Sequence, residues 1–210
     1  MLYNLLSTVT LFLLACFGAV SQDFDSNLLD PVPEVDFNAY GGLWLNALTS
    51  TTVWPDQDSS YCVRAKYTII STDPVAMFSV VNEYNAMSPT GEIKGGEGIL
   101  TAPSPPTPQG SLQVSFAGLN RNFEYRIIKL SSIQNNQYTW AVIYSPFMNA
   151  IFVNYRKDID LNEPNNDLDA LGIYLNSLPV SPKIPLLTKE SILSRLAQFQ
   201  PSECDYSADL

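Results

Sequence analysis

The side chains best suited to chemistry in this sequence are cysteines and carboxylates, because its 210 residues include no histidine. Histidine is the commonest general base and the commonest metal ligand in proteins. Its absence excludes Ser-His-Asp and Cys-His catalysis within the chain. Glu97 and Glu124 lie in runs of strand character, but no pair of carboxylates stands out as an acid–base couple. We therefore predict a protein that is not an enzyme and needs neither a metal nor a cofactor.

The three cysteines are Cys16, Cys62 and Cys204. Cys16 lies within residues 1–21, where an apolar run ends in small residues, as in a cleaved signal peptide. The run is too short for a typical transmembrane helix. Cleavage leaves Cys62 and Cys204, and an even pair in an exported chain favours one disulfide, with two free thiols as the alternative. A disulfide leaves no thiol for nucleophilic chemistry.

Cys16 also allows a second interpretation of the leader. Leu13-Leu14-Ala15-Cys16 resembles the cleavage box of a bacterial lipoprotein, in which the cysteine is lipidated. The first residues carry neither lysine nor arginine, which counts against this alternative. We expect a secreted, extracellular protein, or one anchored by lipid through Cys16 if it is bacterial.

The mature chain is strongly acidic. Its 21 Asp and Glu residues outnumber 11 Lys and Arg, and every charged residue lies from Asp23 onward. The net charge of −10 repels phosphate backbones, so nucleic acid is not an expected partner. The Gly-rich stretch 95–98 lacks the Gly-Lys-Ser/Thr ending of a phosphate loop.

The elements that must position these side chains are mostly strands. From Leu43 onward, short β-like runs alternate with turn residues, and such spacing predicts a sandwich or a barrel. The expected runs cover residues 43–49, 61–71, 76–85, 91–101, 110–117, 123–131, 137–145 and 150–156.

Alternation within the runs predicts which side chains face inward. In the second run, Cys62, Arg64, Lys66 and Thr68 share the outward face, and the inward set is Val63, Ala65, Tyr67 and Ile69. The third run groups Phe78, Val80, Asn82 and Tyr84, and the fifth groups Leu112, Val114 and Phe116. In the seventh run both faces are partly apolar, so alternation does not decide between Trp140 and its neighbours.

The flanking segments differ from the strand region. Residues 22–36 are acidic and contain Pro31 and Pro33, which predicts a mobile or draped N-terminal arm. Residues 157–210 carry two helical stripes, each able to lay an apolar face on the barrel wall. These stripes are Leu168, Leu171, Leu175 and Leu178, and then Ile192, Leu193, Leu196 and Phe199.

Five short motifs in order resemble the lipocalin family, and in particular apolipoprotein D and bacterial lipocalins. Phe37-Asn38-Ala39-Tyr40-Gly41-Gly42-Leu43-Trp44 resembles the opening Gly-x-Trp signature. The segments that resemble the second, third, seventh and eighth strands are 61–67, 80–83, 138–143 and 152–156. The position of Cys204 fits the same template, whereas the segment 157–203 is longer than usual.

The resemblance implies an all-β fold, an eight-stranded antiparallel up-and-down barrel with one or two C-terminal helices packed outside. The implied organisation is a signal peptide (1–21), an arm (22–36), the barrel (37–156) and a helical segment with a tail (157–210). In the family the signature tryptophan plugs the closed end under the last-strand arginine. Gly42, Trp44 and Arg156 are therefore expected to be structural, with a disulfide between Cys62 and Cys204. An avidin-like barrel or an immunoglobulin-like sandwich is the alternative fold.

The function implied is extracellular binding and transport of a fatty acid, sterol, retinoid or carotenoid. From alternation and family likeness, the expected ligand-binding residues are Tyr67, Phe78, Asn82, Tyr84, Phe116, Trp140 and Phe152. Asn82 is the best polar candidate, because its amide both donates and accepts. The implied partners are a small lipophilic ligand and, at the periphery, a membrane or lipoprotein surface, for a monomer or weak homo-oligomer. The alternatives are a lipocalin-type enzyme, isomerase or de-epoxidase-like, and a pigment-carrier or interaction subunit.

Overall fold

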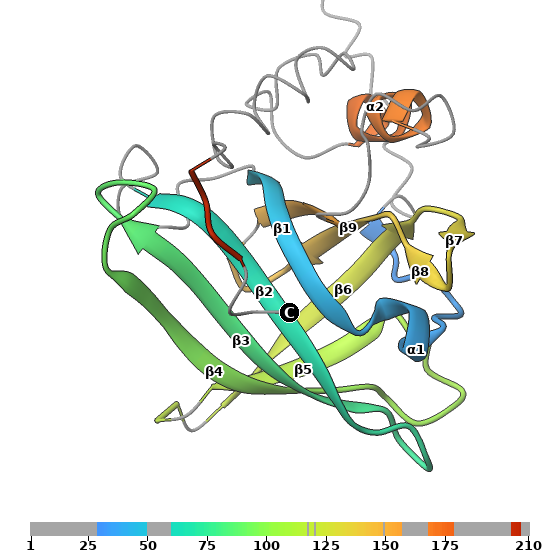
Figure 1. Cartoon of the computed structure of the whole chain (residues 1–210). Helices are drawn as coiled ribbons and strands as arrows, with labels where there is room; N and C mark the ends of the chain where they lie inside the picture. The colour runs from blue at the N-terminus through green and yellow to red at the C-terminus, as the bar shows by residue number, and fades with distance from the viewer. Residues whose placement is uncertain are drawn as a thin grey trace, which may run out of the picture.

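Eight antiparallel strands close into one barrel (Figure 1). The computed structural model describes residues 29–49, 60–116, 118–119, 121–148, 150–156, 168–178 and 203–206. Strands that are neighbours in sequence pair with each other, and β1 pairs with β10 to close the ring in the order β1-β10-β9-β6-β5-β4-β3-β2. The predicted up-and-down barrel is confirmed.

The barrel strands follow the expected runs within two residues at each end, except the seventh. They are β1 (Gly42–Thr49), β2 (Ser60–Ser71), β3 (Met77–Ala86), β4 (Ile93–Thr101), β5 (Ser111–Phe116), β6 (Asn122–Leu130), β9 (Trp140–Ser145) and β10 (Ala150–Tyr155). The seventh run bends at Thr139, so its first residues form β8 (Gln137–Tyr138), which pairs with β7 (Ile133–Gln134) in a small separate hairpin.

A short helix, α1 (Phe37–Tyr40), precedes β1 and was not predicted. Asp36 caps it, because its carboxylate accepts hydrogen bonds from the backbone N–H groups of Asn38 and Ala39. The described part of the preceding arm, residues 29–36, lies against the closed end of the barrel. The Val32 N–H donates to the Ile127 carbonyl, and the Asp36 N–H donates to the Tyr138 hydroxyl. The described part of the arm is thus hydrogen-bonded to the barrel.

Helix α2 (Leu168–Ser177) lies outside the barrel (Figure 1). Leu168, Leu171 and Leu175 are buried there in a cluster with outward-facing side chains of β1, β9 and β10. The first helical stripe is therefore a helix packed on the wall, as predicted. The second, residues 192–199, lies outside the described residues, as does the leader. None of the described helices is long and apolar enough to cross a membrane.

This outer layer explains why alternation left the seventh run undecided. Trp140 and Val142 of β9 face outward into the α2 cluster, whereas Ala141 and Ile143 belong to the inner core. Both faces of β9 are buried, so both are apolar. The expectation that Trp140 faces the ligand is wrong, because its ring packs under α2.

Candidate ligand-binding site

The closed end of the barrel is built around Trp44. The Arg156 guanidinium lies 3.8 Å from the centroid of the Trp44 ring, and both side chains are buried. The guanidinium also donates to five backbone carbonyls, those of Ala39, Tyr40, Gly41, Leu43 and Tyr138. The Trp44 Nε1–H donates to the Tyr40 carbonyl at 2.8 Å. Arg156 thereby joins α1, β1 and β10 into a floor.

Gly42 is required at this floor for two reasons. Its φ of +101° lies in the region that side chains rarely adopt. A Cβ there would also stand 3.1 Å from the Arg156 Nη1. The geometry accords with the structural role expected for Gly42, Trp44 and Arg156.

Three tyrosine hydroxyls meet above the floor. The Tyr125 hydroxyl lies 2.8 Å from that of Tyr40 and 3.0 Å from that of Tyr67, so it joins residues from α1, β2 and β6. Burial raises the pKa of all three phenols, and the Arg156 charge only partly opposes this for Tyr40 and Tyr67. The cluster is therefore neutral and hydrogen-bonded at physiological pH.

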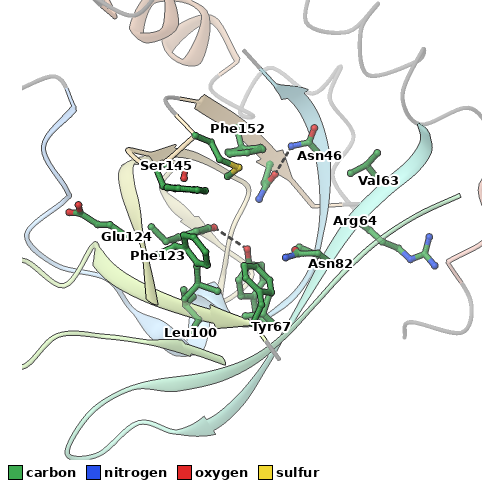
Figure 2. A pocket seen from close by; sticks show the side chains of 18 of the residues that line it. Asn46, Val63, Arg64, Tyr67, Asn82, Leu100, Phe123, Glu124, Ser145 and Phe152 are labelled. Carbon is green, nitrogen blue, oxygen red and sulfur yellow. Dashed lines mark hydrogen bonds between the residues drawn. The ribbon is translucent and has the colours of Figure 1, made fainter. Parts of the chain in front are cut away.

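Above the tyrosines the barrel encloses a cavity of about 350 Å³ (Figure 2). Its wall is mostly aliphatic and aromatic. The apolar lining residues are Val63, Ala65, Val80, Leu100, Val114, Phe116, Leu119, Phe123, Phe147, Met148 and Phe152. Such a wall binds by apolar burial, and the few polar groups set orientation.

The polar groups that line the cavity are mainly amides and hydroxyls. Asn46 donates to Asn154 at 3.1 Å across the β1–β10 pair, and Asn82 points inward from β3 (Figure 2). The two charged lining residues, Arg64 and Glu124, direct their charged ends away from the cavity (Figure 2). Arg64 pairs with Glu83, and Glu124 pairs with Arg126. The interior is thus apolar with neutral polar points.

Aromatic side chains and one arginine form the rim. The Phe123 and Phe147 ring centroids are 4.7 Å apart, and the Arg121 guanidinium lies within 4.6 Å of both. Leu119, Phe147 and Met148 are exposed beside it. The mouth of the cavity is therefore lined by apolar surface.

The predicted disulfide between Cys62 and Cys204 is confirmed, and it lies on the outside of the barrel. It ties the tail to β2 across 142 residues of sequence. Arg64 stands beside it, donating to the Cys62 carbonyl and lying over the Tyr206 ring. Among the described residues, no group of three Cys, Asp or Glu side chains is placed to hold a metal ion.

Four of the seven predicted ligand-binding residues line the cavity: Tyr67, Asn82, Phe116 and Phe152. Phe78 is fully buried in the closed half, against Phe37 and Tyr67. Tyr84 lies further along β3 than Asn82, toward the β3–β4 turn, and is not part of the lining. Alternation gives a residue's face but not its depth, so it placed all three β3 residues together. Trp140 lies outside the barrel.

Two features that give the cavity its polarity were not predicted from the sequence. The first is Tyr125 on β6, and the signal for it is that Phe123 and Tyr125 alternate with Glu124. Asn46 and Asn154 were hidden because each lies in an otherwise apolar strand. The signal that could have found them is that both asparagines lie at inward-facing positions of their strands.

Comparison with solved structures gives a likeness of fold. Apocrustacyanin C1 aligns with a TM-score of 0.51 and 18% identity, over 83% of this chain and 84% of that chain. Insecticyanin from the tobacco hornworm Manduca sexta aligns with a TM-score of 0.48 and 18% identity, over 71% of this chain and 76% of that chain. No protein-family model and no curated protein matches the sequence. The closed eight-stranded antiparallel barrel has the lipocalin fold.

Proposed function

We propose that this chain is an extracellular lipocalin that binds and transports one small hydrophobic molecule inside its barrel. The observation that carries the proposal is the apolar cavity of about 350 Å³, closed below by Trp44 and Arg156. This volume is near the lower end of the roughly 300–1,000 Å³ typical of ligand pockets. Among fatty acids, sterols, retinoids and carotenoids, a carotenoid would have to extend through the mouth.

Affinity is expected to come mainly from burial of apolar surface, and less from directional hydrogen bonds. Each buried CH₂ group contributes about 0.8 kcal/mol, against the cost of immobilising the ligand. Affinity for a series of alkyl chains therefore rises with length until the cavity is full, and then stops rising. The neutral amides of Asn46, Asn82 and Asn154 select among ligands of similar size.

Export and family subtype belong to the same proposal. A disulfide between Cys62 and Cys204 is consistent with an oxidising compartment. The strand motifs support an apolipoprotein D-like lipocalin, and residues 1–21 support a cleaved leader. The intact mass of the protein recovered from its producing cells tests this, because cleavage near Ser21 and lipidation at Cys16 give different masses.

The test of binding is native mass spectrometry of the secreted protein, followed by solvent extraction and identification of what is released. A retained lipophile supports the proposal, and a coloured extract would identify a pigment. Ala65→Phe fills the cavity, whereas Ala170→Phe makes the same change on the exposed face of α2. Binding should fall in the first variant only. If the wild-type protein neither retains nor takes up a lipophile, the proposal fails.

A further inference from the structure

The tyrosine cluster under the cavity contains one more hydroxyl hydrogen than its own hydrogen bonds use. Tyr40, Tyr67 and Tyr125 supply three hydroxyl hydrogens, and their two mutual hydrogen bonds use two of them. Within the part of the chain that the structure describes, these are the hydrogen bonds of ordinary length that the three hydroxyls make. Tyr40 and Tyr67 also interact across the cluster, and a ligand acceptor must compete with that weaker contact. One hydroxyl hydrogen therefore remains available.

The position of that hydrogen follows from burial. If the hydrogens ran from Tyr67 through Tyr125 to Tyr40, the spare hydrogen would lie on Tyr40, which is fully buried and does not line the cavity. There its best remaining acceptor would be the more distant Tyr67 hydroxyl, and a buried donor that is poorly satisfied costs up to about 1–3 kcal/mol. The other arrangements leave the hydrogen on Tyr67 or Tyr125, and both of these line the cavity. The favoured arrangements therefore present a donor to the ligand.

We propose that this cluster recognises a carbonyl oxygen at the buried end of the ligand, so that the barrel takes a lipophile carrying a ketone or similar neutral acceptor. The inference rests on the proposed function and names the chemical class that the same cavity takes. The alkyl or ring body of the ligand would lie above, against Val80, Leu100 and Val114. The acceptor end would enter first and stop at the tyrosines.

The buried surroundings of the cluster favour binding of a neutral carbonyl over binding of a carboxylate. Burial raises the pKa of each phenol, which means that an oxygen anion at this point is penalised. A ligand carboxylate at the same depth would meet the same penalty. The charged ends of Arg64 and Glu124 point away from the cavity, so neither contacts an ion there (Figure 2). A neutral acceptor gains the hydrogen bond without this cost.

The test compares probes on one carbon skeleton: tridecane, methyl undecyl ketone and tridecanoate, each competing with the fluorescence of bound diphenylhexatriene. Wild-type protein should bind the ketone about tenfold more tightly than the alkane, as one net hydrogen bond of about 1.4 kcal/mol gives. In the variant Tyr40→Phe/Tyr67→Phe/Tyr125→Phe this preference should disappear, so that ketone and alkane bind about equally, with alkane affinity retained. Removing all three hydroxyls leaves no orphan partner.

Tyr84→Phe is the matched control, because it deletes a tyrosine hydroxyl on β3 outside the lining and should keep the ketone preference. The infrared carbonyl stretch of the bound ketone needs no variant. A hydrogen bond should place it below its value in an alkane solvent, and an alkane-like stretch would overturn the inference.

The outcomes separate the two proposals. If none of the three probes displaces the dye from wild-type protein, and none is taken up directly, the proposed function fails. If alkane and ketone bind equally to wild-type protein, or if tridecanoate binds most tightly at neutral pH, the function stands and the carbonyl inference is wrong.

Discussion

Replacing Arg156 by methionine tests the argument for the barrel floor. The substitution keeps a long apolar stem but removes the guanidinium that lies over Trp44 and donates to five backbone carbonyls. Arg156 is 4% exposed, so water would not readily replace it. Because Tyr40 O also accepts from Trp44, that carbonyl keeps a partner. The other carbonyls lose a charged donor.

The magnitude follows from these contacts. The five carbonyls are bound through four N–H groups, one on Nε, one on Nη1 and the two on Nη2, which are shared among the carbonyls of Ala39, Tyr40 and Gly41. At about 0.5–1.5 kcal/mol each they total roughly 2–6 kcal/mol, and the cation–π contact adds up to about 2 kcal/mol. Relief from burying a cation offsets part of this sum. We expect the free energy of unfolding to fall by about 3–5 kcal/mol, a large share of the 5–15 kcal/mol typical of domains.

The assay is urea unfolding followed by circular dichroism. Arg156→Lys keeps the charge but loses the planar fork, so its loss should be intermediate. Arg121→Met is the matched control, because Arg121 also lies over aromatic rings but is exposed, and its loss should stay below about 1 kcal/mol. A loss below about 1 kcal/mol for Arg156→Met, or full stability for Arg156→Lys, would show that the guanidinium does not hold the floor together.

Three further predictions use the same unfolding assay. Cys62→Ser/Cys204→Ser should cost up to about 5 kcal/mol, the loop-closure entropy of a 142-residue separation, with ligand affinity retained; an unchanged urea midpoint would contradict it. Leu171→Ala should cost about 2–5 kcal/mol, whereas Ile173→Ala, at a residue of α2 that is 73% exposed, should cost under about 0.5 kcal/mol. Above about pH 10 the unfolded chain loses tyrosine protons that the folded chain keeps, because burial raises the pKa of Tyr40, Tyr67 and Tyr125, so stability should fall as pH rises. If folded wild-type protein develops more tyrosinate absorption near pH 10 than the folded Tyr40→Phe/Tyr67→Phe/Tyr125→Phe variant, this last point is contradicted.

Sequence alone determined the features that depend on local alternation and on short motifs. Val63, Ala65 and Tyr67 face inward because alternate side chains of a strand point to opposite faces, and only one face of that segment is apolar. The same rule placed Phe116 in the cavity. The opening Gly-x-Trp motif indicated the closed end, and counting cysteines indicated the disulfide.

The features that depend on strand register and on the outer layer became visible only in the folded protein. Trp140 faces outward because α2 buries that side of β9, and two apolar faces give alternation nothing to choose between. Tyr40, Tyr67 and Tyr125 are up to 85 residues apart, and their hydroxyls meet only because barrel closure brings α1, β2 and β6 to one depth. Alternation fixes the face of a side chain but not its height along the barrel axis. Strand register sets that height, and so the chemistry at the bottom of the cavity.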